Sequence, residues 1–301
     1  MQFWMRQLIN LTTLTVVIVS TVSCGPGEKN VTSIPHKPAN EVQAITRDSV
    51  SGVASEAARV LLAAYRGYID SISGNTIHWK DKTKMPLSSG RYKGVNISKL
   101  SNKEFEEYLD NCDPEMMVCP DYPYLEPVTA PVKNHDPGRA RNIAFLKKVY
   151  GENEAAVRKH LKKVNWLSKN VNKVIMVNGE NGAAASLQKI SDELDKLPKK
   201  FMKYLNNPAG TFIWRQVAGT KRLSAHSFGI AIDINVNQSH YWRNSKPDKS
   251  GLYKFKNSIP FEIVEIFERN GWVWGGRWYH YDTMHFEYRP EVIVTEKTLT
   301  H

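Results

Sequence analysis

The hydrophobic pattern of this chain changes its period near residue 210. Before that point, three consecutive segments carry apolar residues at helical spacing, and after it apolar and polar residues alternate. A spacing near 3.6 buries one stripe of a helix, whereas alternation buries one face of a strand. No internal repeat is evident. Helical patterns followed by short strands predict an α+β fold, in which helices flank a small antiparallel sheet.

The part of the chain before residue 210 is expected to be largely helical. Apolar faces predict helices over Arg139–Tyr150, Glu152–Leu167 and Ala183–Leu197, and a shorter pattern predicts an earlier helix over Glu56–Tyr68. Residues 73–137 combine glycine, proline and short apolar groups without a clear period. We therefore expect an irregular segment there, inside a helical N-terminal region.

The alternating pattern is clearest over residues 230–236. Isoleucines at every second position alternate with smaller or polar residues, which predicts a strand with one buried face. The alternation directs Asp233 away from the isoleucines, toward a side where a cleft could form. The remaining predicted elements are a helix between Pro260 and Gly271 and two last strands over Trp272–Tyr279 and Thr283–Tyr288.

Three side chains of types that bind zinc fall on these predicted strands and the loop beside them. His226 precedes the first strand, Asp233 lies on it, and His285 lies on the last strand. Two imidazoles and one carboxylate make a three-ligand set that leaves a fourth position for water. Each residue alone has an ordinary explanation, as a loop cap, an ion-pair partner or a core histidine. Together they predict a mononuclear zinc site.

The residues around these ligands resemble a family signature. Residues 224–233 have the sequence Ser-Ala-His-Ser-Phe-Gly-Ile-Ala-Ile-Asp, and residues 282–285 have the sequence Asp-Thr-Met-His. Bacterial zinc peptidases, which include D-alanyl-D-alanine carboxypeptidases, D-Ala-D-Ala dipeptidases and L-alanyl-D-glutamate endopeptidases, carry Ser-x-His-x-x-Gly-x-Ala-x-Asp and an acidic residue three before a second histidine. The resemblance covers roughly residues 205–290. It implies one Zn²⁺ per chain, bound by His226, Asp233 and His285.

The resemblance also implies a reaction, the hydrolysis of peptidoglycan stem peptides by metal-activated water. Asp282 would be the general base, because a carboxylate beside that water can take its proton and pass it to the leaving amine. Arg215 occupies the place where the family holds a substrate carboxylate or carbonyl, and Arg222 is its competitor. Carboxypeptidase members usually carry Glu where this chain has Asp282, whereas the endopeptidases often carry Asp. The cleaved bond, terminal or internal, therefore stays open.

Three further residues belong to the motif or stand beside it. Ser224 and Glu287 are expected to form hydrogen bonds that orient the metal-bound imidazoles. His280 is expected either to contact substrate or to join an aromatic cluster. Residues three apart in a flat strand face opposite sides, so Asp282 and His285 can share a cleft only if a bend precedes the strand.

A function of a different class is a non-catalytic lipoprotein that contains zinc and binds the cell wall. Such a protein needs neither a general base nor an open coordination position. Because Asp282 is retained at the acidic position of the motif, the enzyme is the favoured interpretation.

The N-terminus has the pattern of an export signal. Arg6 precedes an apolar stretch, Leu8–Val19, which ends in small residues and is shorter than a permanent membrane span. We predict a signal peptide over residues 1–23. Residues 21–24, Thr-Val-Ser-Cys, resemble a bacterial lipobox, which predicts lipidation of Cys24 and a membrane-tethered protein in the cell envelope. The alternative is cleavage before Cys24 without a lipid.

The predicted organisation after cleavage has three parts. Residues 24–50 are rich in Pro, Ser, Thr and Lys and form a linker. Residues 51–137 are an N-terminal region, and residues 138–295 are the catalytic domain. Cys112 and Cys119 remain after Cys24, and in an exported protein a pair this close predicts a disulfide, with free thiols or a metal site as the alternatives.

The net charge restricts the partners without identifying one. The 301 residues carry a formal charge of +11 at pH 7, which favours nucleic acid, an anionic membrane surface or an acidic cell-wall polymer. Lysines occur as scattered pairs without the motif context of nucleic-acid binding. The expected partners are peptidoglycan stem peptides and, through the lipid anchor, a membrane, with no nucleic acid.

Overall fold

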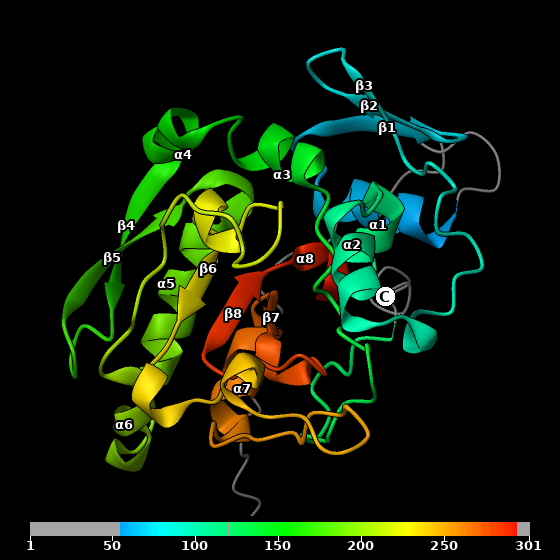
Figure 1. Cartoon of the computed structure of the whole chain (residues 1–301). Helices are drawn as coiled ribbons and strands as arrows, with labels where there is room; N and C mark the ends of the chain where they lie inside the picture. The colour runs from blue at the N-terminus through cyan, green and yellow to red at the C-terminus, as the bar shows by residue number, and fades with distance from the viewer. Residues whose placement is uncertain (1–54, 120, 294–301) are drawn as a thin grey trace, which may run out of the picture. The chain divides into compact units, whose positions relative to one another are not determined.

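Three small antiparallel sheets and the helices around them form the described part of the chain, residues 55–119 and 121–293, in the computed structural model (Figure 1). These residues lie within one compact unit, Val42–His301. The predicted α+β class is confirmed, although the strands form separate sheets instead of one. The predicted signal peptide, Cys24 and the linker lie outside the described residues.

The sheet that carries the predicted ligands has the strand order β6-β8-β7. β6 (Ala231–Asp233) and β7 (Trp272–Trp274) each pair antiparallel with β8 (His285–Tyr288). In this register Asp233 lies directly opposite His285. Directly opposed residues of an antiparallel pair have neighbouring side chains. The register therefore brings together two ligands that are far apart in sequence.

Helix α7 (Phe261–Arg269) covers this sheet and has the predicted bounds within two residues. Phe267 of α7 stacks on Phe286 of β8, with ring centroids 3.9 Å apart and an interplanar angle of 20°. The helix ends before Gly271, whose φ of +86° is a left-handed conformation that favours glycine. The chain then turns directly into β7.

Three of the predicted helices are shorter in the structure. The helix predicted over Glu56–Tyr68 is α1 (Glu56–Ala64). The helix predicted from Arg139 begins only at Ile143 (α3, Ile143–Tyr150), because the Asn142 side chain caps it by accepting from the Phe145 N–H. The helix predicted over Ala183–Leu197 is α5 (Ala183–Leu194).

The helix predicted over Glu152–Leu167 is wrong in its second half. α4 (Glu154–His160) ends at Leu161, where the backbone becomes extended, and β4 (Leu161–Trp166) follows. β4 pairs along its whole length with β5 (Lys173–Asn178), a strand that was not predicted. Val164 and Trp166 fit a strand pattern as well as a helical one, and the pairing decides between them.

The N-terminal region contains more regular structure than expected. An antiparallel three-stranded sheet begins just before the segment that was predicted to be irregular, and its last two strands and the helix α2 (Asn102–Asp110) lie within that segment. α2 begins with a capping box, in which Ser101 and Glu104 satisfy each other's backbone N–H groups. The other helices and strands are β1 (Ile69–Ser73), β2 (Thr76–Trp79), β3 (Lys84–Pro86), α6 (Met202–Leu205) and α8 (Pro290–Ile293).

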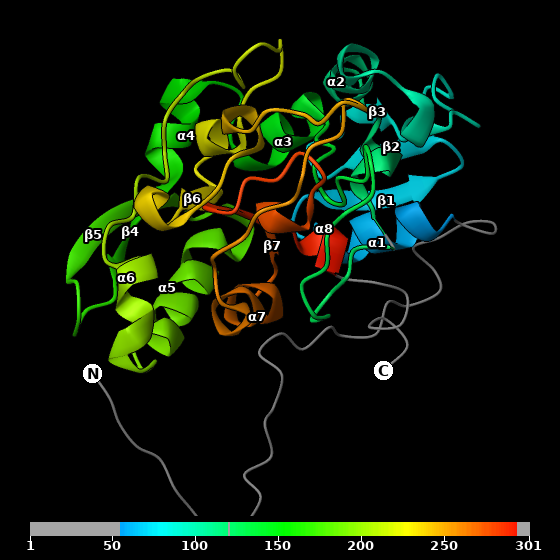
Figure 2. The same cartoon turned by 60° about the horizontal axis from the view of Figure 1, so that its bottom comes forward.

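The first and last described helices pack against each other. α1 and α8 lie side by side in both views (Figures 1 and 2). The Tyr65 hydroxyl, just after α1, donates a hydrogen bond of 2.6 Å to Glu291 of α8, and both residues are buried. The N-terminal region is thereby held against the end of the segment that carries the predicted ligands.

Cys112 and Cys119 are both free thiols in the structure, so the expected disulfide is not formed there. Cys112 is buried just after α2, and burial raises the pKa of its thiol to about 12. The Cys119 thiol instead donates to the Asp121 carboxylate at 3.0 Å.

Within residues 55–119 and 121–293, none of the helices combines the length and the apolar character that a membrane crossing requires.

Candidate metal centre

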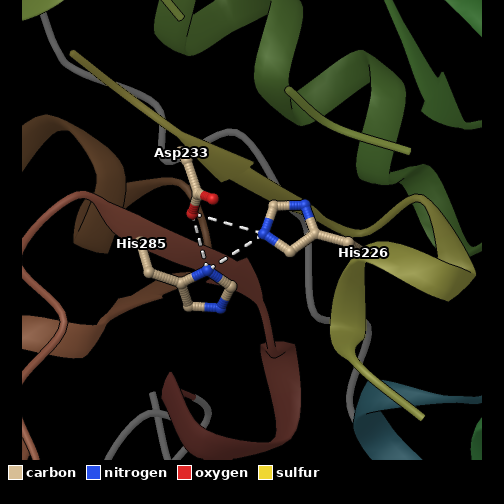
Figure 3. A group of neighbouring side chains, drawn as sticks. All are labelled: His226, Asp233 and His285. Carbon is tan, nitrogen blue, oxygen red and sulfur yellow. Dashed lines mark hydrogen bonds and ion pairs between the residues drawn. The ribbon is translucent and has the colours of Figure 1, made fainter. Parts of the chain in front are cut away.

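The three predicted ligands point toward one another (Figure 3). Asp233 Oδ1 lies 3.3 Å from His226 Nε2 and 2.9 Å from His285 Nδ1, and the two imidazole nitrogens are 3.2 Å apart. Both histidines are buried and the Asp233 side chain is about one-fifth exposed, at 21%. Among the described residues, these three form a group that could hold a metal ion.

The short turn around His226 explains the small residues of the motif. His226 lies in a 3₁₀ turn, Ala225–Phe228, which is capped by the Ser224 hydroxyl, an acceptor for the His226 backbone N–H at 3.4 Å. Ser224 therefore holds the turn, and not the imidazole as was expected. Gly229 ends the turn with φ +66°, and a Cβ there would lie 2.9 Å from Leu161 Cδ2 and 3.2 Å from the Asn178 nitrogen. Glycine is needed at this position both for the conformation and for the space.

Hydrogen bonds behind the imidazoles select the nitrogen that faces the group. His226 Nδ1 lies 3.1 Å from the Thr211 carbonyl, and His285 Nε2 lies 2.8 Å from Glu287 Oε1. A carbonyl and a carboxylate accept, so these nitrogens carry the protons and leave His226 Nε2 and His285 Nδ1 free to bind a metal. Ligands at about 2.0–2.1 Å in a tetrahedron are about 3.3 Å apart, so the three donors fit a zinc ion.

A pocket of about 290 Å³ opens at the ligands. Four arginines, Tyr241 and two tryptophans line it together with the three ligands, Asp282 and His280. A larger hollow of about 540 Å³ lies among residues 75–116, but none of the predicted ligands lines it. The predicted ligands and Asp282 therefore line the smaller pocket and not the larger one.

Asp282 lies in a bend before β8. The His285 N–H donates to the Asp282 carbonyl at 3.1 Å, which closes a turn and lets both side chains line the same pocket. Burial raises the pKa of Asp282 to about 7. Its Oδ1 atom is buried and has no hydrogen-bond partner among the described residues. This is a carboxyl group held free for an interaction inside the pocket.

His280 and Glu287 are held by groups from the region before the motif. His280 Nδ1 lies 2.9 Å from Asp136 Oδ2, and the His280 ring also stacks on Phe105 at 5.3 Å, so it lines the pocket and joins an aromatic cluster at once. Glu287 binds Arg141 through both carboxylate oxygens. The same carboxylate accepts from His285, as expected.

The two candidate arginines have different surroundings. Both line the pocket. Arg222 is buried and donates to Glu106 and Asp110, at 2.6 Å each. Arg215 is exposed, its side chain bonds at 3.5 Å to the neighbouring Gln216 carbonyl, and it makes no ion pair within the part of the chain that the structure describes.

Sequence reasoning missed the pocket residues that come from before the motif. Arg139, Arg141 and Asp136 line or support the pocket, and the sequence Asp-Pro-Gly-Arg-Ala-Arg over 136–141 is the signal that was available. Residues 139–141 of this segment were instead predicted to be the start of a helix. The partners of these residues lie up to 146 positions away, and no local pattern indicates them.

The fold and the site together define an α+β domain with a His-Asp-His group suited to one metal ion. Residues 218–288 match the model of a protein family described as D-alanyl-D-alanine carboxypeptidase, which confirms the resemblance inferred from the motif. The matched segment includes His226, Asp233, Asp282 and His285 and begins after Arg215. No curated protein and no solved structure gave a significant match to the chain.

Proposed function

We propose that this protein is an exported zinc metallopeptidase that hydrolyses peptidoglycan stem peptides. The bond would be either the terminal bond of D-Ala-D-Ala or the internal bond between L-alanine and D-glutamate. The family match and the three converging donors support the peptidase class. The observation that carries the proposal is Asp282, a half-buried residue in the pocket of the predicted ligands whose Oδ1 atom is buried and has no hydrogen-bond partner among the described residues.

In this mechanism His226, Asp233 and His285 hold the metal ion. When bound, zinc would act as a Lewis acid, which polarises the scissile carbonyl and lowers the pKa of water. Asp282 accepts the proton of the attacking water and then delivers it to the nitrogen of the departing amine. The burial that raises the pKa of Asp282 to about 7 suits a group that must both take and return a proton.

Arg215 is proposed to bind a carboxylate or carbonyl of the substrate. Its guanidinium is exposed at the pocket and has no carboxylate partner among the described residues, whereas Arg222 already binds two carboxylates. His280 is proposed to face the substrate through Nε2, because Nδ1 is held by Asp136. Both roles place donors around a peptide that the metal and Asp282 act upon.

Export and lipidation at Cys24 complete the proposal. Their support is the sequence pattern of residues 1–24, which lie outside the described residues. Metabolic labelling with a palmitate analogue should give a labelled wild-type protein and an unlabelled Cys24→Ala variant. If the wild-type protein is exported but carries no label, the signal peptide is cleaved before Cys24 without addition of a lipid.

The deciding experiment is digestion of purified peptidoglycan by the zinc-loaded protein, with mass spectrometry of the products. Released D-alanine identifies a carboxypeptidase, and a new glutamate amine identifies an endopeptidase. Asp282→Asn is the matched control, because it preserves the shape of the side chain and removes the base. If the wild-type protein binds peptidoglycan but does not cleave it, the alternative function, a non-catalytic cell-wall-binding protein, would be favoured instead.

A further inference from the structure

A carboxylate of α2 reaches two arginines of the metal pocket. Glu106 Oε1 accepts from Arg139 Nη2 at 3.0 Å, and Glu106 Oε2 accepts from Arg222 Nη2 at 2.6 Å. Both guanidinium groups line the pocket, and their side chains are 7% and 1% exposed. Glu106 lies before the segment that matches the peptidase family. One side chain from the N-terminal region thus bridges two cations of the pocket wall.

Each of these arginines also has a second carboxylate. Arg139 Nη1 donates to Asp136 Oδ2 at 2.7 Å, and Arg222 Nη1 donates to Asp110 Oδ1 at 2.6 Å. Burial would raise the pKa of Glu106, but Arg139 and Arg222 outweigh it and hold that pKa at about 2. Glu106 is therefore ionised at neutral pH. The wall contains a continuous chain of alternating charges in which Glu106 is the central member.

The other arginines in and near the pocket differ in whether they are bound to a carboxylate. Arg141 binds Glu287 through both carboxylate oxygens. Arg215 has no ion pair within the residues that the structure describes. Arg243 lies near Glu106, at 4.0 Å, but does not line the pocket. A guanidinium that already donates to carboxylates has little capacity left for another anion, so Arg215 is the pocket cation that is open to one.

We propose that Glu106 is a positioning residue that determines where an anionic substrate group binds. By holding and neutralising Arg139 and Arg222, it leaves Arg215 as the one available cation of the described pocket. A substrate carboxylate then binds in a single place relative to the metal ligands and Asp282. The substrate part of this inference rests on the proposed function. The arrangement of the arginines does not, and it can be tested without any substrate.

The variant that tests the proposal is Glu106→Gln. It removes one negative charge, while Arg139 retains Asp136 and Arg222 retains Asp110, so each buried guanidinium keeps a partner. The matched control is Glu107→Gln, which removes the same charge from the next position of α2. Glu107 is exposed and makes no ion pair in the described part of the chain. Thermal melting and zinc content are measured first, to check that both variants fold and bind zinc as the wild type does.

The first measurement is modification of arginine by phenylglyoxal, located by peptide mass mapping in the zinc-loaded protein. In the wild type, Arg215 should react at least about tenfold faster than Arg139 and Arg222, because buried and ion-paired groups react only after local opening. Glu106→Gln should accelerate the reaction of Arg139 and Arg222, and Glu107→Gln should not. Equal rates at the three arginines of the wild type, or unchanged protection in Glu106→Gln, would overturn the proposal.

The second measurement compares binding of a peptide that ends in D-Ala-D-Ala with binding of its C-terminal amide, in the Asp282→Asn background that prevents turnover. Arg215→Ala should weaken binding of the acid about tenfold or more and leave the amide nearly unchanged. In the Glu106→Gln background, Arg215→Ala should weaken binding of the acid less than about threefold, because the Nη2 atoms of Arg139 and Arg222, no longer bound to a carboxylate, can then bind the substrate carboxylate. Equal losses in both backgrounds would contradict the role of Glu106.

The two measurements separate the two proposals. If the arginine pattern is as expected but neither peptide binds, the proposed peptidase function fails and the arrangement by Glu106 stands. If the protein hydrolyses the peptide but the three arginines do not differ in reactivity as expected, the peptidase function stands and the role of Glu106 fails.

Discussion

The matched segment and the region before it contribute to one pocket in different ways. Residues 218–288 supply the three predicted ligands and Asp282 from two short motifs. Residues 106–141 supply Glu106, Arg139 and Arg141 without any motif. The predicted ligands can be recognised in the sequence because metal binding requires particular donor types held close together. The charged residues of the pocket wall need only form ion pairs with one another, and many different sequences can provide such pairs.

The two regions also differ in what holds their side chains. The ligand imidazoles are oriented by single hydrogen bonds, from His226 to a backbone carbonyl and from His285 to Glu287. The wall is a set of buried ion pairs that depend on one another. Loss of a ligand should therefore abolish the site, whereas loss of a wall residue should shift affinities and stability by smaller amounts.

The largest effect is expected from His285→Ala. The substitution removes one of three metal donors and one of the two strand-paired ligands. Zinc content, measured by mass spectrometry on the purified protein, should fall from about one per chain to near zero, and hydrolysis should be lost with it. A variant that kept its zinc would show that the metal lies elsewhere.

Asp282→Asn should lower peptide hydrolysis by about a thousandfold while the zinc content stays at the wild-type value. The amide cannot accept the proton of water, and general base catalysis contributes roughly this much. Turnover of stem peptides and zinc content measured on the same preparation check the prediction. Undiminished turnover would assign the base to another residue.

Glu287→Gln should weaken zinc binding about 10- to 100-fold, because a neutral amide oxygen is a weaker acceptor than a carboxylate for the His285 N–H and leaves Arg141 without its carboxylate. Competition with a chelator gives the affinity directly. Glu291→Gln is a control from the same buried network, since Glu291 binds Arg289 and Tyr65 instead of a ligand. An equal loss in both variants would mean that the effect comes from general destabilisation.

Acid should destabilise the protein partly through the pocket wall. Arg139 and Arg222 hold the pKa of Glu106 in the folded protein at about 2, below its usual value of 4.5, so the unfolded chain binds the proton first as pH falls. The stabilisation is therefore present above about pH 4.5 and is lost progressively as pH falls toward 2, with about 2 kcal/mol lost by pH 3. Urea unfolding at pH 7 and pH 3 should show a smaller difference in Glu106→Gln than in wild type. Equal differences would show that Glu106 contributes no acid sensitivity.

The smallest effect is expected from Arg215→Ala, with KM for an anionic peptide raised about tenfold, or about 1.4 kcal/mol, and little loss of zinc. Arg222→Ala should instead lower the free energy of unfolding, because it leaves Glu106 and Asp110 with one cation fewer. Kinetics and denaturation of the two variants distinguish these outcomes. A larger rise of KM in Arg222→Ala would reverse the assignment of the arginines.

Elements with one strong pattern were predictable, and elements with an ambiguous one were not. α7, between Pro260 and Gly271, was predicted nearly to the residue because its start, apolar face and glycine stop agree. β4 was predicted as helix because Val164 fits both periods, and the partner strand that decides between them was itself not recognised. The free Cys112 and Cys119 show the same limit, since proximity in sequence does not determine which side chains meet.

The sequence by itself determined the donors, their order and the family resemblance, because two imidazoles, two carboxylates and a glycine turn at these spacings are local properties. Only the tertiary structure decided which atoms converge: the register that sets Asp233 opposite His285, and the bend that brings Asp282 to the same pocket. It also decided which arginine remains open. That choice depends on Glu106, more than a hundred positions before its partner Arg222, and such a pairing is fixed by packing, not by spacing along the chain.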